Sequence, residues 1–348
     1  MLGMRRAGKS SIQQVLFNNL APKQTFYLES TMRIVKHTYD TIIPLEIWDC
    51  PGNISVDKVG ASLAEFSAVI FVIDIRDVYN QPISKLVEFI TAFYDVNPTV
   101  NFEVFVHKAE KLQDDDKYEN FRQINERVND RLYDLSADYE QLPLNFHLTS
   151  IYDSSLHEAF SRVIHKLVDS LAYLEHLLNV FIANIQCPKA YLYDVKSCLY
   201  IATDASPVDA ATHSLSCEFI KLLNTLGPLY TSTSGTPIWS SDGDSALSSS
   251  TSVSSGSSDT TSLATKARKK ALFYPSAATT TQTGTTVTYH LITEHLALLS
   301  LLPTVVYESR RGIVEYNVVF LREGVQEICD AEKEARIVDS GTETVKNT

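Results

Sequence analysis

The sequence has no excess of basic side chains: 30 Lys and Arg stand against 42 Asp and Glu, for a formal net charge of −12. This balance argues against nucleic acid as a main partner, because phosphate backbones are bound by basic surfaces. No apolar run reaches the roughly 18 residues that a membrane span needs. Position 2 is leucine rather than glycine, and no cysteine lies near the C-terminal VKNT. The sequence therefore predicts no direct membrane anchor, so any membrane residence would come through a partner.

The cysteines form no recognisable framework. A disulfide-stapled chain would carry an even, regularly spaced set, and a zinc site would carry paired ligands. The sequence predicts reduced thiols in an intracellular protein instead, because its cysteines are odd in number and none is in a CxxC pair. The five are Cys50, Cys187, Cys198, Cys217 and Cys329.

Short apolar strands alternate with helical patterns in the first half of the chain. Continuous apolar runs of this kind are typical of strands buried on both faces of a parallel sheet. Strands are expected at 44–49, 68–74, 102–107 and 144–150. Helices are expected around 82–95 and 117–135. The alternation predicts a doubly wound α/β domain over residues 1–170.

The composition changes in the second half of the chain. Ser, Thr, Gly and Ala dominate 231–284, so we expect this insertion to be disordered, since it buries too little apolar surface to order itself. An α+β domain is expected over 171–230 and 285–335, followed by a polar tail at 336–348. Its predicted elements are a helical stripe within 163–185, a hairpin from AYLYD and SCLYIATD, a helix at 209–226, apolar strands at 286–292 and 296–302, and a helix at 314–335.

The stretch GMRRAGKS, from Gly3 to Ser10, fits the phosphate-binding pattern G-x-x-x-x-G-K-[ST] residue for residue. In such a loop, backbone N–H groups around Arg5–Lys9 surround the β-phosphate at the positive end of a helix. Lys9 would reach the β- and γ-phosphates, and Ser10 would hold Mg²⁺. The pattern is moderately specific by itself, so the rest of the chain has to support it.

Three further loops follow expected strand ends: DCPG at 49–52, HKAE at 107–110 and TSI at 149–151. The Asp49 carboxylate could hold Mg²⁺ through water, and Gly52 could offer its N–H to a γ-phosphate, although Asp-x-Pro-Gly is also a common turn. Lys108 and Glu110 stand where a base could lie. Open α/β sheets bind ligands at the carboxyl ends of their strands, and the order of these loops is that of the small GTPases.

The agreement extends beyond the superfamily and covers nearly the whole chain except the Ser/Thr insertion and the tail. The chain strongly resembles the Rag GTPases, specifically the RagC/RagD-like subtype and its fungal counterparts. The stretches that carry the resemblance are GMRRAGKSSIQ, FYLEST, IWDCPG, FEVFVHKAE, LTSIYDSSLHEAFSRVIHKL, YIATDASPVD and RRGIVEYN.

This resemblance implies a P-loop small-GTPase domain followed by an α+β roadblock-type domain, which forms an obligate heterodimer with a RagA-like GTPase. Such dimers are held by a lipidated scaffold complex on the cytoplasmic face of the vacuolar or lysosomal membrane. They relay amino-acid availability to the TOR kinase complex. The first strand of this fold is central, yet only Met1 and Leu2 precede the loop. We therefore expect this strand to be truncated and the natural chain to begin further upstream.

The resemblance also assigns roles by position, with GTP or GDP and Mg²⁺ as ligands. Thr31 is the magnesium-binding threonine of switch I, and Asp49 and Gly52 begin switch II. The phosphate-binding loop residues are Arg5, Arg6, Ala7, Gly8, Lys9, Ser10 and Ser11, and Thr25 belongs to switch I. The residues around the guanine are His107, Lys108, Glu110, Ser150 and Ile151.

Three positions depart from the family pattern. Asn53 stands where the family has the glutamine that orients the attacking water, and it is one methylene shorter. Since about 1 Å of misplacement can cost about 100-fold in rate, we expect slow hydrolysis. Glu110 replaces aspartate and reaches further, which could soften the selectivity for guanine. The switch II segment after Asn53 is several residues shorter than in the animal members.

Two other functions stay open. A weakly or non-hydrolysing nucleotide-binding scaffold subunit of the same dimer would agree with Asn53 and with the truncated strand. A P-loop kinase or ATPase would need an arginine-rich lid and an acceptor site, neither of which the sequence offers. It would also leave HKAE unexplained. The guanine-nucleotide switch is therefore the favoured interpretation.

Overall fold

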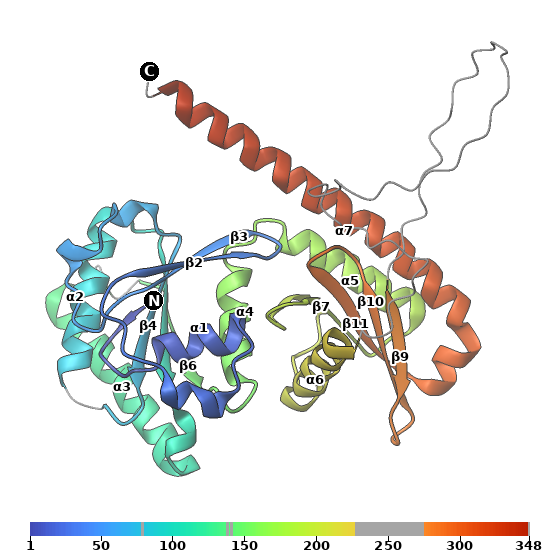
Figure 1. The fold of residues 1–348 in the computed structure, drawn as a ribbon, viewed down its shortest axis with the longest axis horizontal. Helices are drawn as coiled ribbons and strands as arrows, with labels where there is room; N and C mark the ends of the chain where they lie inside the picture. Colours follow the sequence, from blue (N-terminus) through green and yellow to red (C-terminus); the bar gives the residue numbers. More distant parts are fainter. Residues whose placement is uncertain (78–79, 137–138, 140–141, 227–274, 347–348) are drawn as a thin grey trace, which may run out of the picture.

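The computed structural model describes residues 1–77, 80–136, 139, 142–226 and 275–346, which form two units (Figure 1). The first unit contains a parallel sheet in the order β1-β4-β5-β6. Its strands are β1 (Leu2–Gly3), β4 (Ala68–Asp74), β5 (Asn101–His107) and β6 (Leu144–Thr149). A separate antiparallel hairpin lies beside it, made of β2 (Val35–Asp40) and β3 (Pro44–Asp49).

Two pairs of helices cover the two faces of the parallel sheet. Successive residues of β4 point to opposite faces, so Val72 packs with Ile12 and Phe160, whereas Phe71 packs with Phe89. The helices on the Val72 face are α1 (Lys9–Phe17) and α4 (Ser155–His165), and those on the Phe71 face are α2 (Asn80–Val96) and α3 (Asp114–Leu135). The predicted doubly wound α/β architecture is confirmed.

The first strand is short. β1 has two residues, and Leu2 and Gly3 pair with Phe71 and Val72 of β4. It leads directly into the glycine-rich loop and α1. Short 3-10 helices complete the unit: η1 (Pro22–Tyr27), η2 (Val56–Lys58), η3 (Leu63–Glu65) and η4 (Ala109–Lys111).

The second unit is an antiparallel sheet in the order β8-β7-β11-β10-β9, with helices on both faces. Its antiparallel strands and flanking helices agree with the α+β class expected for this half of the chain. Its strands are β7 (Lys189–Asp194), β8 (Tyr200–Thr203), β9 (Ser276–Thr280), β10 (Thr285–Leu291) and β11 (Leu296–Pro303). Its helices are α5 (Leu171–Ile185), α6 (Ala210–Leu226) and α7 (Thr304–Lys346).

Side chains of β7 show how the sheet is covered. Leu192 belongs to the apolar cluster formed with α5 and α7, while Tyr191 and Tyr193 belong to the cluster on the α6 side. The first of these clusters continues into α1 and α4 of the first unit. The Tyr200 N–H also donates to Ser161 Oγ of α4 at 3.1 Å. The two units therefore share a buried apolar core.

Two expectations for the second half need correction. The sequence predicts a disordered insertion over 231–284. Its part up to residue 274 lies outside the described residues, and for 276–284 the prediction is wrong. There, β9 pairs with β10 through a turn at Gly284 (φ 76°), so backbone pairing orders a Thr- and Ala-rich segment that has little apolar content.

The helix expected over 314–335 lies within α7, which begins at Thr304, directly after Pro303, and is kinked at Arg310, whose backbone is not helical (φ −126°, ψ 21°). The part after the kink continues to Lys346, so the polar tail expected from residue 336 is helical as far as the structure describes it. A proline is tolerated at this boundary, because a helix does not use that N–H. Strand β2 was not predicted, since its alternating, half-exposed side chains include Lys36 and His37. No described helix is long and apolar enough to cross a membrane.

Candidate functional site

The loop between β1 and α1 forms the first part of the site. Gly3 (φ 132°) and Gly8 (φ 112°) both adopt backbone conformations that favour glycine. A Cβ atom would lie 2.2 Å from the Val72 carbonyl oxygen at Gly3, and 2.5 Å from the His107 ring at Gly8. The loop therefore lies directly against β4 and β5, and α1 begins immediately after it at Lys9.

Lys9 is buried, and its ammonium group lies back over its own loop. Nζ donates to the carbonyl oxygens of Gly3 and Met4 at 3.0 Å each. Burial lowers the pKa of Lys9, and the nearby Asp49 carboxylate partly opposes this shift. A lysine at the N-terminus of a helix suits an anion such as phosphate, because the ammonium charge and the helix dipole act together.

Three oxygen-bearing side chains from separate segments meet beside α1, and we call them the oxygen cluster: Ser10, Thr31 and Asp49. Ser10 Oγ donates to Asp49 Oδ2 at 2.6 Å, and Thr31 Oγ1 donates to the same oxygen at 3.0 Å. Asp49 is 3% exposed. Its other oxygen, Oδ1, is buried and has no hydrogen-bond partner among the described residues.

The oxygen cluster fits a magnesium ion. Mg²⁺ prefers hard oxygen ligands and is usually held by one or two carboxylates, with waters and substrate phosphates completing the shell. The cluster supplies two hydroxyls and one carboxylate, and no described residue satisfies the Oδ1 atom of that carboxylate. Lys9 lies on the same turn of α1, so a polyphosphate at the loop would reach the ion.

Lys108 links the phosphate loop to the end of β4. It adopts a left-handed conformation (φ 66°), and its Nζ donates to the Arg6 carbonyl oxygen at 2.5 Å and to Asp74 Oδ2 at 2.8 Å. Burial raises the pKa of Asp74, but hydrogen bonds from Arg76 and Lys108 outweigh it and hold this pKa at about 2. The sequence analysis missed Asp74, although a carboxylate ending the apolar run AVIFVID was a signal for it.

His107 is a support for the loop rather than an open binding group. It is 1% exposed, its ring lies under Gly8, and Nδ1 is 3.0 Å from Thr149 Oγ1. Burial, and then the Lys108 charge, lower its pKa to about 4, so the imidazole is neutral at pH 7. Thr149, which the sequence analysis did not single out, fixes the ring from the end of β6.

The structure joins Glu110 and Ser150, two of the residues predicted around the base. Ser150 Oγ donates to Glu110 Oε2 at 2.7 Å, and the Ser150 N–H donates to Ser155 Oγ at 3.0 Å. Glu110 itself is exposed, with one carboxylate oxygen oriented by the hydroxyl. These contacts hold an acidic acceptor near Lys108 at the open edge of the sheet.

Arg5 and Thr25, two of the predicted nucleotide-binding residues, have their side chains engaged elsewhere in the protein. Arg5 Nη2 donates to Ser30 Oγ at 3.1 Å, which ties the phosphate loop to the segment carrying Thr31. Thr25 Oγ1 donates to the Pro22 carbonyl oxygen at 2.8 Å, so its hydroxyl is engaged in η1 rather than in the oxygen cluster. The remaining predicted residues are buried or half-buried: Ala7, Ser11 and Ile151.

Gly52 and Asn53, the predicted catalytic residues, lie next to the phosphate loop. A Cβ atom on Gly52 would lie 2.2 Å from the Arg5 backbone nitrogen, so only glycine allows this approach. The Gly52 carbonyl oxygen accepts a hydrogen bond from Lys85 Nζ of α2 at 2.9 Å. Asn53 follows and is exposed. The sequence analysis missed Lys85, because a single lysine on a helix gives no pattern.

A phosphate loop after the first strand of a parallel sheet, an oxygen cluster beside its lysine, and a Lys–Glu segment at a neighbouring strand end define a P-loop domain of the small-GTPase class. The particular family follows from the sequence over most of the chain. Residues 1–222 match the Gtr1/RagA G protein conserved region, and the chain belongs to this family.

Similar proteins refine this assignment. Ras-related GTP-binding protein C of Homo sapiens is 44% identical over 236 residues, which cover 66% of this chain and 59% of that protein. GTP-binding protein gtr2 of Schizosaccharomyces pombe is 40% identical over 234 residues, which cover 66% of this chain and 74% of that protein. Ras-related GTP-binding protein A of Dictyostelium discoideum is only 22% identical over 223 residues, which cover 61% of this chain and 71% of that protein. The resemblance to the RagC/RagD-like subtype is thus confirmed.

The match covers only part of the length of these relatives. It spans 52% of mouse Ras-related GTP-binding protein D and 59% of the human and mouse C proteins, so the chain covers little more than half of these relatives. Among solved structures, Myxococcus xanthus MglB covers 47% of this chain at 10% identity and a TM-score of 0.30. That similarity is too weak to add to the fold described above.

The Asp74–Lys108 pair predicts a pH dependence of stability. The pKa of Asp74 is about 2 when folded and about 3.9 when unfolded, so its ionised form stabilises the fold above pH 4. This contribution, on the order of 2 kcal/mol, should be lost as the pH falls from 4 towards 2. Urea unfolding of the wild type and Asp74→Asn should therefore differ most above pH 5 and converge in acid.

The matched control is Asp77→Asn, three residues further on. Burial, and then the Asp74 charge, raise the pKa of Asp77, so its removal should not reproduce the loss above pH 5. A stability difference between the wild type and Asp74→Asn that stayed constant from pH 7 to pH 3 would contradict the role given to the ion pair.

Proposed function

We propose that this protein is a Rag-type GTPase, a switch that binds GTP or GDP with Mg²⁺ and hydrolyses GTP. The observation that carries the proposal is the oxygen cluster, in which a buried aspartate oxygen has no partner among the described residues and lies beside the lysine of a phosphate loop. Membership of the Gtr1/RagA G protein family supports it, and so do the names of the relatives, which describe GTP-binding proteins.

In this proposal the loop binds the phosphates, and the oxygen cluster binds the magnesium ion beside them. Backbone N–H groups of 5–11 surround the phosphate chain, and Lys9 exchanges its two carbonyl partners for phosphate oxygens. Ser10, Thr31 and Asp49 hold the magnesium ion, which neutralises phosphate charge when bound. Thr31 lies between two exposed neighbours, Ser30 and Met32, so binding at the cluster fixes an otherwise open segment.

The base lies at the other end of the site. Glu110 accepts hydrogen bonds from the guanine N1–H and N2 amino groups, and Ser150 orients the carboxylate for this task. Lys108 is fixed between Arg6 and Asp74, so its aliphatic stem forms one wall of the base pocket. Because Lys108 contacts the phosphate loop directly, binding of the base and of the phosphates supports the same backbone.

Hydrolysis is slow because of Asn53. Gly52 is held against Arg5 on one side and by Lys85 on the other, so the residue after it starts from a fixed backbone. Asn53 is exposed and one methylene shorter than glutamine, and its amide falls short of the water next to the γ-phosphate. A weakly or non-hydrolysing subunit is the alternative outcome of the rate measurement below.

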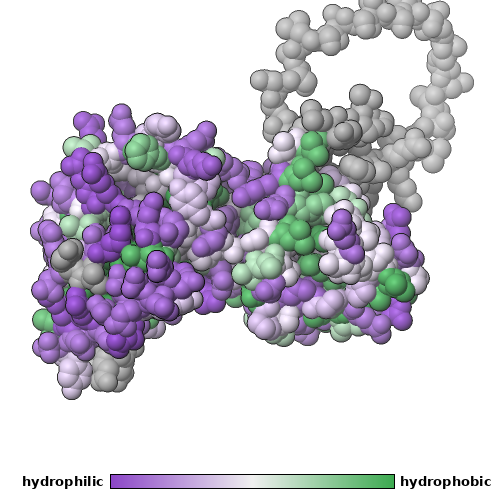
Figure 2. Space-filling view, turned by 90° about the horizontal axis from the view of Figure 1, so that it is seen from below, coloured by the Kyte–Doolittle hydropathy of each residue, from purple (hydrophilic) through white to green (hydrophobic). Residues whose placement is uncertain are grey.

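The second unit supplies the surface for a RagA-like partner. Helix α7 packs one side on the sheet through Val314, Val318 and Leu321, while its other side exposes apolar side chains. A stripe of this kind marks a protein interface. The exposed residues of this stripe, all after the kink at Arg310, are Ile313, Tyr316, Val319 and Phe320. On the face seen in Figure 2, hydrophobic side chains likewise gather over the second unit, whereas the first unit is mainly hydrophilic.

In the cell, we place this heterodimer on the cytoplasmic face of the vacuolar or lysosomal membrane. A lipidated scaffold complex holds it there, and it relays amino-acid availability to the TOR kinase complex. Family membership supports this assignment. The partner-type relatives, such as GTP-binding protein gtr1 of Schizosaccharomyces pombe at 26% identity, belong to the same family of sequences.

The oxygen cluster is tested with two threonine variants. Thr31→Ala removes a hydroxyl bonded to Asp49, whereas Thr25→Ala removes one bonded only within its own turn. Hydrogen bonds to charged groups contribute about 1.5–3 kcal/mol, so Thr31→Ala should weaken magnesium-dependent GTP binding at least about 10-fold. Thr25→Ala should change it less than about twofold. Equal losses in both variants, measured by fluorescent-nucleotide titration, would contradict the site.

Asn53 is tested by lengthening its side chain. In single-turnover assays, Asn53→Gln should hydrolyse GTP faster than the wild type, by about 10- to 100-fold, because the longer amide reaches the attacking water. Asn53→Ala is the control and should be no faster than the wild type. If Asn53→Gln is no faster than the wild type, the role given to Asn53 is wrong. Absence of turnover in both proteins while GTP stays bound would favour the non-hydrolysing scaffold.

The dimer surface is tested by co-expression with a RagA-like GTPase, followed by chromatographic identification of the co-purified nucleotide. Tyr316→Glu and Phe320→Glu place charges in the exposed apolar stripe and should each reduce recovery of the complex at least about 10-fold. Glu308→Ala, an exposed change in the part of α7 before its kink at Arg310, should leave recovery unchanged. Recovery of adenine nucleotide would defeat the guanine assignment.

A further inference from the structure

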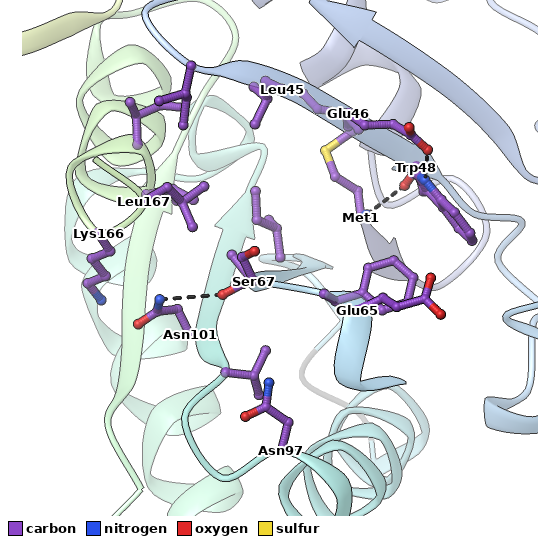
Figure 3. A pocket seen from close by; sticks show the side chains of 18 of the residues that line it. Met1, Leu45, Glu46, Trp48, Glu65, Ser67, Asn97, Asn101, Lys166 and Leu167 are labelled. Carbon is purple, nitrogen blue, oxygen red and sulfur yellow. Dashed lines mark hydrogen bonds between the residues drawn. The ribbon is translucent and has the colours of Figure 1, made fainter. Parts of the chain in front are cut away.

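Among the hollows of the described structure, two contrast in chemistry. The larger, of about 880 Å³, lies beside β3 and β4 (Figure 3). Polar side chains in its lining are engaged by the protein: Asn101 donates to the Ser67 carbonyl oxygen at 3.4 Å, and Trp48 Nε1 donates to Glu46 Oε1 at 2.5 Å. Such contacts stabilise the strands around the groove and do not point to a ligand or a reaction.

The smaller cavity, of about 500 Å³, lies between the two units and reaches a thiol. Residues 19–22 and 151–154 of the first unit line one side, and Lys196 and helix α6 of the second unit line the other. His213 and Cys217, four positions apart on α6, both contribute to the lining. A molecule as small as water or peroxide can therefore approach the Cys217 side chain, although it is only 7% exposed.

A second thiol lies beside Cys217. The Cys217 Sγ is 3.6 Å from the carbonyl oxygen of Cys198, which stands 19 positions earlier in the chain. A hydrogen bond between the two thiols lowers the pKa of Cys198 and raises that of Cys217, and it is the largest cause of both shifts. Both cysteines are free and buried. Their sulfur atoms are thus close neighbours, as a disulfide requires.

The backbone holds Cys198 in place. This residue adopts a left-handed conformation (φ 56°), and its N–H donates to the Asp194 carbonyl oxygen at 3.0 Å. Asp194 Oδ2 in turn accepts hydrogen bonds from the Ser197 N–H at 2.8 Å and from Ser197 Oγ at 2.6 Å. The turn between β7 and β8 therefore fixes the thiol of Cys198 against α6.

Cys187 shows a different environment for a buried thiol. Its Sγ donates to the carbonyl oxygens of Lys189 and Leu301, at 3.0 and 3.1 Å, and burial raises its pKa to about 12. A thiol of this kind is unreactive. The lowered pKa of Cys198 and the second thiol beside it are instead typical of a redox-sensing cysteine next to a resolving cysteine.

We propose that Cys198 and Cys217 are a redox-sensitive site that forms a reversible disulfide, with hydrogen peroxide as the oxidant. The Cys198 thiolate attacks one peroxide oxygen, the O–O bond breaks, and the leaving hydroxide takes up a proton to become water. The Cys217 thiol then attacks the Cys198 sulfur, the S–O bond breaks, and a second water leaves. The two sulfurs together lose two electrons, which reduce the peroxide, and the two thiol protons end in the waters.

The disulfide would join α6 to the turn between β7 and β8, and both of these elements face the first unit. Asn19 Nδ2, after α1, donates to the Lys196 carbonyl oxygen of the turn at 3.2 Å. The ring centroids of His213 on α6 and His157 on α4 are 6.2 Å apart. Oxidation therefore stiffens the side of the second unit that contacts the first. This inference does not depend on which nucleotide the protein binds.

The test treats the full chain with hydrogen peroxide, unfolds it in an excess of alkylating reagent and maps the cysteines by mass spectrometry. Alkylation of Cys198 and Cys217 should fall together at least about 10-fold, and a peptide joining them should appear. Dithiothreitol should restore both thiols. Cys187 is the matched control, since it is a buried thiol bonded to carbonyl oxygens, and it should stay alkylated.

Two variants test the order of the steps. Cys217→Ser removes the resolving thiol and should leave a sulfenic acid on Cys198 that dimedone labels, whereas Cys187→Ser should form the disulfide as the wild type does. Dimedone labelling of Cys198 no greater than in the wild type would contradict the assigned nucleophile. The half-buried Cys329 reports in the wild type that peroxide has acted. If Cys329 is oxidised while Cys198 and Cys217 remain fully alkylated, the proposal is overturned.

Discussion

Parallel strand pairing is the constraint on which the rest of the first unit depends. Parallel strands send their carboxyl ends to one edge of the sheet, so the residues that follow them meet there whatever their distance along the chain. Lys108 thus reaches the Arg6 carbonyl oxygen across 102 residues, and His107 lies under Gly8. The loops need no further device to converge, because the register of β1, β4, β5 and β6 already brings them together.

The buried charges of this unit divide into satisfied and unsatisfied groups. Asp74 is fully engaged by Arg76 and Lys108, and Lys9 is engaged by two carbonyl oxygens. In contrast, Asp49 keeps one buried oxygen without a partner in the described structure. Since an unpaired buried polar atom is costly, this oxygen indicates where the protein is completed by a ligand.

β1 and the phosphate loop form one closely packed segment. β1 has two residues, and both its glycine and the loop beyond it lie against β4 and β5. The second unit is coupled through a different route, because the apolar cluster of α1 and α4 continues into α5 and the antiparallel sheet.

By itself, the sequence determined the elements with strong local signals. The continuous apolar runs predicted β3 and β4 with the bounds that the structure shows, and the glycine pattern of Gly3–Ser10 marked the phosphate loop. Loop patterns also marked Ser10 and Asp49, and the family resemblance added Thr31 to them. Weakly apolar elements were missed, such as β2 and β9, because backbone pairing rather than composition orders them.

Only the tertiary structure decided which polar side chains act together. Glu103 is fully buried in the middle of an apolar strand, and its partners Lys166 and His147 lie 63 and 44 residues away. Asp74, Lys85 and Thr149 likewise gain their roles from neighbours that no local pattern reveals. Sequence periodicity reports which side of an element faces the core, but a polar contact depends on the distance between atoms of separate elements, which packing alone sets.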